Sequence, residues 1–300
     1  MKPQLTIGPV QFHWNPEQWK NFYRGIAGAP VDIVYIGEVV CSKRAPFYEP
    51  LYGEIADMLQ DAGKRVVFST LAEVAVKLDR KVMAGMCAME DFPVEANDAS
   101  ALHFLSGSPH RIGPFLNVYN EDSLDFLARN GATHICFPPE LPRDALKILA
   151  GRAQLAGMEC EVQVYGRIPL ALSARCYHAR AHGRVKDNCQ FVCEKDPDGM
   201  NLKTVKGKSF LAINGIETMS HSCLNLVQEL DELQKMGISH FRISPHSHDM
   251  GAIAQIFRDA LDRKMNKADA VAALSDLRPD FPFSNGFYHR REGYQFVSGR

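Results

Sequence analysis

Apolar residues along the chain form short runs that alternate with longer amphipathic stretches. Runs rich in β-branched and aromatic residues follow stops that contain glycine, such as Asn130 and Gly131 before residues 134–137. Glycine suits the left-handed position that ends a helix, and the apolar runs suit strands. Because these runs lack a clean alternation of polar and apolar positions, we expect strands that are buried on both faces.

The stretches between the runs have helical spacing. Apolar side chains recur at the i, i+3, i+4 and i+7 positions between residues 48 and 59, and repeated strand–helix units imply a parallel sheet. The eight candidate strands cover residues 5–10, 32–36, 65–70, 92–96, 115–119, 134–137, 161–165 and 241–244. Eight strands favour a (β/α)8 TIM-like barrel, either regular or distorted, over an open doubly wound sheet. We therefore predict an α/β fold in which residues 1–300 form a single barrel domain.

Two regions break this rhythm. Residues of about 167–219, after the seventh strand, are rich in cysteine and charged side chains and poor in apolar periodicity. The tail at 277–300 also lacks regular periodicity. A long irregular loop within a compact domain is usually functional, so we expect the Cys-rich insertion to carry the site.

Composition and charge narrow the class of protein. Hydrophobic residues make up 46% of the chain and the formal net charge is -1, which argues for a sizeable core and against a nucleic-acid or membrane-surface partner. We see no signal peptide at the start and no run of about 18 apolar residues. The expected location is therefore cytoplasmic, with no membrane insertion.

Eight cysteines are many for a cytosolic protein of 300 residues. The cytosol keeps thiols reduced, so metal binding or plain burial must explain them. Cys176, Cys189 and Cys193 have polar neighbours, which fits burial poorly. Cys41 follows the second predicted strand, and loops after barrel strands meet at one face, so it could complete a set of four thiolates. Such a set suits an iron–sulfur cluster or zinc.

The remaining cysteines have a simpler interpretation. Cys136 and Cys160 lie in or beside apolar strands and Cys87 lies on a predicted helix, so we expect them to be packing residues, whereas Cys223 stays ambiguous. Structural zinc usually shows two close cysteine pairs. The gap of twelve residues after Cys176 favours a cubane slightly over zinc, and both remain open from spacing alone.

Charged side chains near these cysteines are candidate substrate ligands. Glu38 lies at the end of the second strand, while Arg44 and Arg175 each lie close to a cysteine, where a guanidinium could bind a carboxylate. Other polar residues at strand ends read as helix starts, such as Asp98. His246 is expected in a surface loop together with its neighbour at 248. No catalytic residue is assigned, because no phosphate loop, nucleophile elbow or zinc-protease motif is present.

Several segments resemble a known family. They are GEVVCSKR at 37–44, GRIPLA at 166–171, SARC at 173–176, NGIETMS at 214–220 and NG at 285–286. These segments resemble the collagenase-like peptidase family, and within it the UbiV branch of ubiquinone biosynthesis proteins. The resemblance extends over nearly the whole chain, and the four-cysteine set is its most specific part.

The resemblance implies a function. Proteins of this branch carry a [4Fe-4S] cluster on four cysteines, which map here to Cys41, Cys176, Cys189 and Cys193. They act as a heterodimer with a homologous UbiU-like partner in ring hydroxylation of a quinone precursor without molecular oxygen. Related hydroxylases take oxygen from a small organic donor, with prephenate as one candidate. The cysteine-containing signature of the peptidase branch is absent from this sequence.

Alternatives remain at this point. A cubane with four thiolate ligands has no open iron, so we favour electron transfer or a structural role here, with the reactive site in the partner. A zinc-stabilised binding protein and a peptidase-like hydrolase are the main alternatives. RNA modification is disfavoured, because the chain shows no basic or aromatic nucleic-acid surface pattern.

Overall fold

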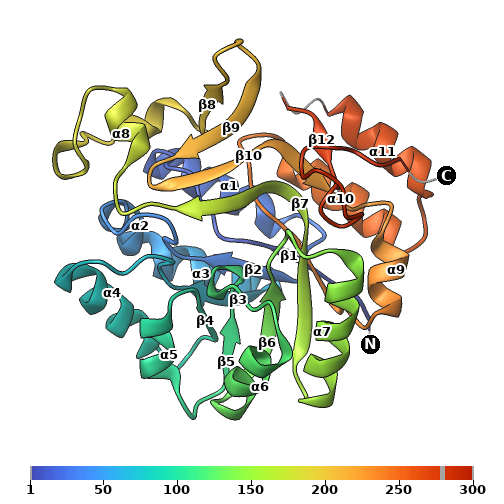
Figure 1. The fold of residues 1–300 in the computed structure, drawn as a ribbon. Helices are drawn as coiled ribbons and strands as arrows, with labels where there is room; N and C mark the ends of the chain where they lie inside the picture. Colours follow the sequence, from blue (N-terminus) through green and yellow to red (C-terminus); the bar gives the residue numbers. More distant parts are fainter. Residues whose placement is uncertain (1, 278–280, 299–300) are drawn as a thin grey trace.

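The computed structural model describes residues 2–277 and 281–298, and its centre is a closed barrel of parallel strands (Figure 1). The barrel strands are β1 (Gln4–Ile7), β2 (Ile33–Ile36), β3 (Arg65–Ser69), β4 (Val94–Ala96), β5 (His110–Ile112), β6 (Ala132–Phe137), β7 (Glu159–Leu172) and β11 (His240–Ile243). Consecutive strands pair in this order, and β11 closes the ring by pairing with both β7 and β1. The predicted α/β barrel is therefore confirmed.

Helices cover the outside of the barrel and connect its strands. They are α1 (Pro16–Ala27), α2 (Ala45–Tyr48), α3 (Tyr52–Asp61), α4 (Lys77–Cys87), α5 (Ala99–Leu105), α6 (Glu121–Arg129), α7 (Arg143–Leu155), α9 (Leu230–Lys235), α10 (Met250–Leu261) and α11 (Lys267–Asp276). Helix α1 shows why they form where they do. Asn15 caps it with a reciprocal Asn–Gln box, Pro16 fills the first turn, and its apolar side buries Trp19 and Tyr23.

One predicted strand is wrong. Residues 115–119 do not form a strand; the 3-10 helix η2 (Pro114–Leu116) begins there, and the fifth strand is β5, which precedes it. Pro114 has no N–H for a ladder hydrogen bond, and Asn117 adopts a left-handed φ of 54° that ends the helix. The other seven predicted strands overlap the barrel strands β1 to β4, β6, β7 and β11.

Strand β7 continues beyond the barrel. Its second half pairs with β10 (Glu217–Asn225), which pairs in turn with β9 (Ser209–Asn214) and then β8 (Met200–Lys203). At the point of departure Gly166 has φ +112°, and a Cβ there would lie 2.6 Å from the Cβ of Ser244. Only glycine fits this crossing with β11.

This antiparallel extension corrects the expectation of an irregular loop at 167–219, because strands occupy both ends of that segment. Its irregular part is 173–199, which holds the short helix α8 (Tyr177–Ala181), η3 (Lys186–Asn188) and η4 (Val192–Lys195). The C-terminal tail contributes β12 (Phe283–Ser284), which pairs with β10, and is otherwise without a helix or strand in its described residues from 281 to 298. Residues 278–280 and 299–300 of the predicted tail lie outside the described residues.

The barrel interior holds a buried polar network to which every barrel strand contributes one side chain. Its members are Thr6 (β1), Tyr35 (β2), Ser69 (β3), Glu95 (β4), Arg111 (β5), His134 (β6), Glu161 (β7) and Arg242 (β11). Arg242 Nη2 bridges the carboxylates of Glu95 and Glu161 at 2.5 and 2.6 Å. Tyr35 donates to Glu161 at 2.8 Å and accepts from Arg111 at 2.8 Å. Burial alone would raise the pKa of Glu161, but Arg242 and His134 outweigh it and the pKa is lowered.

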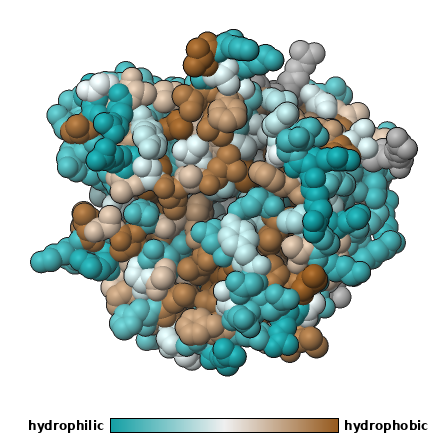
Figure 2. All heavy atoms as spheres, in the orientation of Figure 1, coloured by the Kyte–Doolittle hydropathy of each residue, from teal (hydrophilic) through white to brown (hydrophobic). Residues whose placement is uncertain are grey.

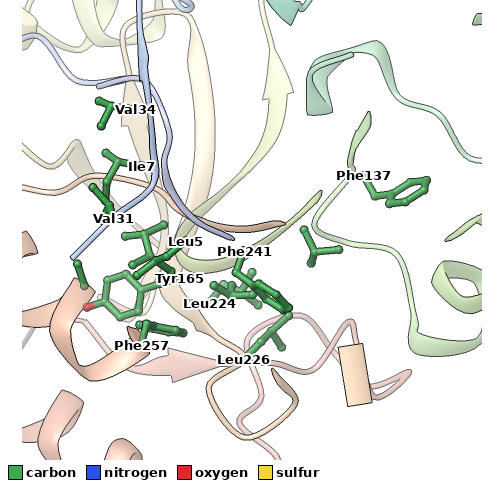
Figure 3. Packing of buried hydrophobic residues seen from close by; sticks show 14 of the residues in the cluster. Leu5, Ile7, Val31, Val34, Phe137, Tyr165, Leu224, Leu226, Phe241 and Phe257 are labelled. Atoms are coloured by element: carbon green, nitrogen blue, oxygen red, sulfur yellow. The ribbon is translucent and has the colours of Figure 1, made fainter. Parts of the chain in front are cut away.

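Apolar side chains fill the space between the barrel and its helices. Figure 3 shows Tyr165 of β7 beside Phe257 of α10, with ring centroids 5.8 Å apart, and Leu5 of β1 next to them. On the surface, Figure 2 shows apolar side chains running from the β8–β9 hairpin to helices α5 and α6. Among the described residues, no helix combines the length and the apolar character that crossing a membrane requires.

Replacing Arg242 with methionine should destabilise the fold strongly. The change leaves Glu95 and Glu161 buried without their shared cation, and breaking a buried ion pair in this way costs about 3 to 5 kcal/mol of unfolding free energy. Urea denaturation measures the loss.

The control is Arg152→Met, because Arg152 forms its ion pair with Asp125 at the exposed surface of the protein. Surface pairs contribute little, so this variant should unfold close to the wild type. Equal denaturation midpoints for the Arg242 and Arg152 variants would contradict a stabilising role for the interior network.

Candidate functional site

The loop after β2 carries Cys41 and is held by a buried carboxylate. Glu38 accepts hydrogen bonds from the backbone N–H groups of Val40 and Cys41 at 2.8 and 2.9 Å. Its side chain is almost fully buried. Burial raises the pKa of Glu38, while Arg44 and these two N–H groups oppose the rise. Glu38 therefore fixes the direction in which the loop presents the Cys41 thiol.

The other three candidate cysteines come from the irregular segment after β7. Cys176 precedes α8, and its Sγ accepts from the backbone N–H of Ala179 at 3.3 Å. Cys189 follows η3 and Cys193 lies within η4. Between them the backbone turns tightly, since Phe191 has a left-handed φ of 48°. This turn lets two cysteines four positions apart face the same space.

All four predicted cysteines line one cavity. Its lining residues are Cys41, Lys43, Arg44, Cys176, His178, Ala179, Lys186, Cys189, Phe191, Val192, Cys193 and Gly215. Cys176 and Cys193 are buried, which corrects the expectation from their polar neighbours, and Cys41 and Cys189 are partly exposed. The remaining cysteines do not line it; Cys136, Cys160 and Cys223 are buried elsewhere and Cys87 lies on α4.

A buried guanidinium faces these thiols. Arg44 is 1% exposed, and it donates to the backbone oxygen of Gln11 at 2.8 Å and to Asn214 Oδ1 at 2.9 Å. It also reaches the Cys193 thiol. Gly215, in the β9–β10 turn, makes room for it, because a Cβ there would lie 2.6 Å from Nη2 of Arg44. Arg44 thus places a fixed positive charge beside the cysteines.

The same guanidinium shapes the acidity of the thiols. Burial raises the pKa of both Cys41 and Cys193, and the Coulombic attraction of Arg44 opposes that rise at each. Burial would likewise lower the pKa of Arg44, but Cys193 and Glu38 raise it. A thiolate formed here therefore has its countercharge already in place.

A wider cleft adjoins the cysteine cavity and shares Lys43, Cys176 and Lys186 with it. The cleft has a volume of about 500 Å³. Four cations line it, namely Lys43, Arg175, Arg180 and Lys186, with Asp79 and Asp187 as the acidic residues. Positive charge exceeds negative charge in this cleft, which favours an anionic ligand.

The three predicted substrate ligands thus have different positions. Arg175 lies at the wide cleft. Arg44 lines the cysteine cavity and Glu38 is buried under the Cys41 loop, and both bind other groups of the protein. Substrate binding by these three residues stays a prediction. Asp98 caps helix α5 as expected, through a bond from the N–H of Ser100.

Sequence reasoning missed a possible metal-binding group next to the cysteines. His178, His182 and Asp196 bring one ligand atom each within 4.8 Å of one another. His178 is buried, lines the cysteine cavity and pairs with Asp196 at 2.8 Å. His178 lies in α8 and His182 directly follows it, with the two rings stacked 5.7 Å apart. A spacing of four residues brings helical side chains to one side, so that spacing could have identified the pair.

Glu217 supports the Arg44 side of the site from β10. It is fully buried, accepts from Asn214 Nδ2 at 3.0 Å, and its other oxygen has no partner. Burial raises its pKa from 4.5 to about 8, with the bond from Asn214 and the charge of Arg44 opposing the rise. Its carboxyl is therefore mostly uncharged at neutral pH.

The raised pKa of Glu217 predicts a loss of stability as pH rises. Between pH 4.5 and about 8 the folded state keeps a proton that the unfolded state releases, so unfolding free energy falls with pH. The slope is about 1.4 kcal/mol per pH unit for one group. Glu217→Gln should flatten the slope between pH 5.5 and 7.5 in urea denaturation, and identical slopes in the two proteins would contradict the assignment.

Comparisons with solved structures find proteins that share little sequence with this chain. The uncharacterized B. cereus protein matches with a TM-score of 0.39 and 11% identity, over 84% of this chain and 63% of that one. The Bacillus megaterium spore cortex-lytic enzyme SleL matches with 0.45 and 10%, over 86% and 74%. A putative dihydrodipicolinate synthetase from Pseudomonas aeruginosa matches with 0.49 and 7%, over 91% and 80%.

A sequence family gives a firmer result. The model of Peptidase family U32 matches residues 15–297. This range includes both loops that carry the four cysteines, and it confirms the resemblance at the level of the family. The chain belongs to Peptidase family U32.

Proposed function

We propose that this protein is the iron–sulfur subunit of an oxygen-independent ring-hydroxylation system in ubiquinone biosynthesis. One observation carries the proposal: four cysteines from two loops far apart in the sequence line one cavity beside a buried arginine. The resemblance of these loops to the UbiV branch supplies the reaction. It also supplies the partner, a UbiU-like homologue that would form a heterodimer with this chain.

The donor set fits the proposed cofactor. Cys41, Cys176, Cys189 and Cys193 would hold a [4Fe-4S] cluster, whose usual protein ligands are four thiolates. When bound, the cluster would supply one-electron transfer. Positive charge and hydrogen bonds near the sulfurs tune such sites, and Arg44 supplies both at Cys193.

Residues of the chain would then have separate tasks. Arg44 balances negative charge at the thiolates, and Glu38 keeps the Cys41 loop in place through two backbone bonds. The cations of the wide cleft, Arg175 among them, would bind the carboxylate of a small organic oxygen donor, for which prephenate is one candidate. Quinone-precursor binding and chemistry would be shared with the partner.

Two alternatives make different predictions. A zinc-stabilised protein would use the same thiolates, or the group of His178, His182 and Asp196, to pin the segment after β7. A peptidase-like hydrolase, which the family description suggests, would keep its activity after chelation and exposure to air. Metal content separates these possibilities from the cluster.

Protein purified without oxygen should contain about four irons and four sulfides per chain, with the broad visible absorption of a cubane. Cys176→Ala should lose most of this iron, because it removes one of four ligands. Iron, sulfide and zinc are measured on the same samples, with His182→Ala included to detect zinc at the histidine group.

The matched control is Cys87→Ala. Cys87 lies on α4, does not line the cysteine cavity and is partly exposed, so its loss should leave the iron content unchanged. Zinc in place of iron, or equal iron in the Cys176 and Cys87 variants, would refute the cluster assignment.

The hydroxylation role predicts a conditional defect in cells. Cells that carry Cys193→Ser in place of the native protein should lose ubiquinone when grown without oxygen and keep it when grown in air. Quinone extraction and chromatography measure the content. Normal ubiquinone in anaerobic cells with this variant would reject the role, even if the protein binds a cluster.

A further inference from the structure

A second hollow lies where the loops after β1 and β11 meet, against helix α1. Its volume is about 280 Å³. The lining residues are Trp14, Gln18, Asn21, Phe22, His246, Ser247 and His248, none of which lines the cysteine cavity. Both loops follow the carboxyl ends of barrel strands, the face on which barrel proteins bind their ligands.

The floor of this hollow contains an unpartnered histidine. His246 is 1% exposed, which corrects the expectation of a surface loop. Neither ring nitrogen makes a hydrogen bond of normal geometry, although the charges of Asp198 and Arg167 and the backbone of Ser244 are near. Burial lowers the pKa of His246 to about 3, so the ring is neutral at pH 7. A buried polar group left unpaired in this way calls for an outside partner.

The walls of the hollow indicate the chemistry of that partner. Trp14 and Phe22 meet edge to face with ring centroids 5.3 Å apart, and Nε2 of His248 has no hydrogen bond but lies 4.0 Å from the carboxylate of Asp198. Amide groups of Gln18 and Asn21 lie at the rim. Among the described lining residues none is Asp, Glu, Lys or Arg, and the nearby Asp198 already faces His248, which favours an uncharged ligand. The volume suits a molecule with one or two rings.

We propose that this hollow binds the ring of a phenol. The ring would lie against Trp14 and Phe22, and its hydroxyl would pair with the imidazole of His246 or His248. A neutral imidazole offers one donor and one acceptor, which matches a hydroxyl group that does both.

Three consecutive residues, 196–198, contact both the cysteine cavity and the hollow. Asp196 pairs with His178, which lines that cavity; Pro197 accepts a bond from Trp14 Nε1 at 2.7 Å; Asp198 accepts one from the Ser247 N–H at 2.8 Å. Two residues that line the hollow, Trp14 and Ser247, are therefore held by the segment that follows Cys193. As the position of the ring to be hydroxylated, the hollow rests on the proposed function, whereas phenol binding itself does not need the metal.

The test is calorimetric titration of the full-length protein with 4-methylphenol, and with toluene as the same ring without the hydroxyl. We expect saturable binding of one 4-methylphenol, and toluene weaker by at least about tenfold, because the imidazoles stay unpaired with it. His246→Phe should bring the two affinities together. Asn21→Trp, at an exposed rim position, should fill the hollow and weaken 4-methylphenol by about tenfold or more.

Lys20→Trp is the matched control, since Lys20 lies on the same helix, pairs with Glu54 and does not line the hollow, and this variant should bind like the wild type. Equal affinity for toluene, or an unchanged affinity in Asn21→Trp, would overturn the inference. The Cys176→Ala variant should still bind 4-methylphenol. If wild-type protein purified without oxygen contains no iron but binds 4-methylphenol, the cluster is refuted and this inference stands. If the protein contains iron but does not bind 4-methylphenol, this inference is refuted and the cluster stands.

Discussion

The buried contact of Arg242 with Glu95 and Glu161 is the constraint on which the barrel depends. These residues come from β11, β4 and β7, so one guanidinium connects strands from opposite parts of the ring. Charges this deep are tolerated only when they are paired and hydrogen-bonded. Two glutamates face two arginines, Arg242 and Arg111, so the interior charge balances. The geometry of the ring is thereby fixed from inside as well as by its backbone ladders.

A fixed ring determines where the loops at its carboxyl end meet. The loop after β2 brings Cys41, and the segment after β7 brings the other three cysteines. Arg44 resembles Arg242 in being a buried arginine with hydrogen-bonded partners, here Gln11 and Asn214. Its charge faces the thiols of Cys41 and Cys193 as well as the carboxylate of Glu38. The site thus resembles the interior network in having a buried arginine, but here the arginine borders a cavity lined by thiols.

The barrel, and the gathering of four cysteines around one cavity, were predictable because each leaves a pattern in the chain. Repeated strand–helix units identify the fold, and the place of Cys41 after the second strand predicts that it meets the cysteines after the seventh. The polar neighbours of Cys176 were a poor guide, because its thiol packs among Val40, Ala179 and Ile216. The fifth strand was misplaced because β5 has only three residues and the apolar run after Pro114 has the stronger pattern.

The other features of the fold and the site could not be predicted from the sequence, because they depend on tertiary contacts. Interior charges such as Arg242 lie singly within apolar strands, and only the closed ring shows that they meet. The extension of β7 and the burial of His246 are equally tertiary, since they depend on partners far away in sequence. The spacing of His178 and His182 was a local cue to the histidine group. Asp196, which pairs with His178, lies eighteen residues later and had no such cue.

The departure of β7 from the barrel at Gly166 has a consequence for the order of assembly. Within β7, the ring ladders with β6 and β11 use only residues up to Tyr165, so the ring can close through β11 before the segment at 173–199 finds its place. The cysteines on that segment would then be the last part to settle against Cys41. Under the proposed function, loading of the cysteines would therefore be a separate event that takes place on a closed barrel.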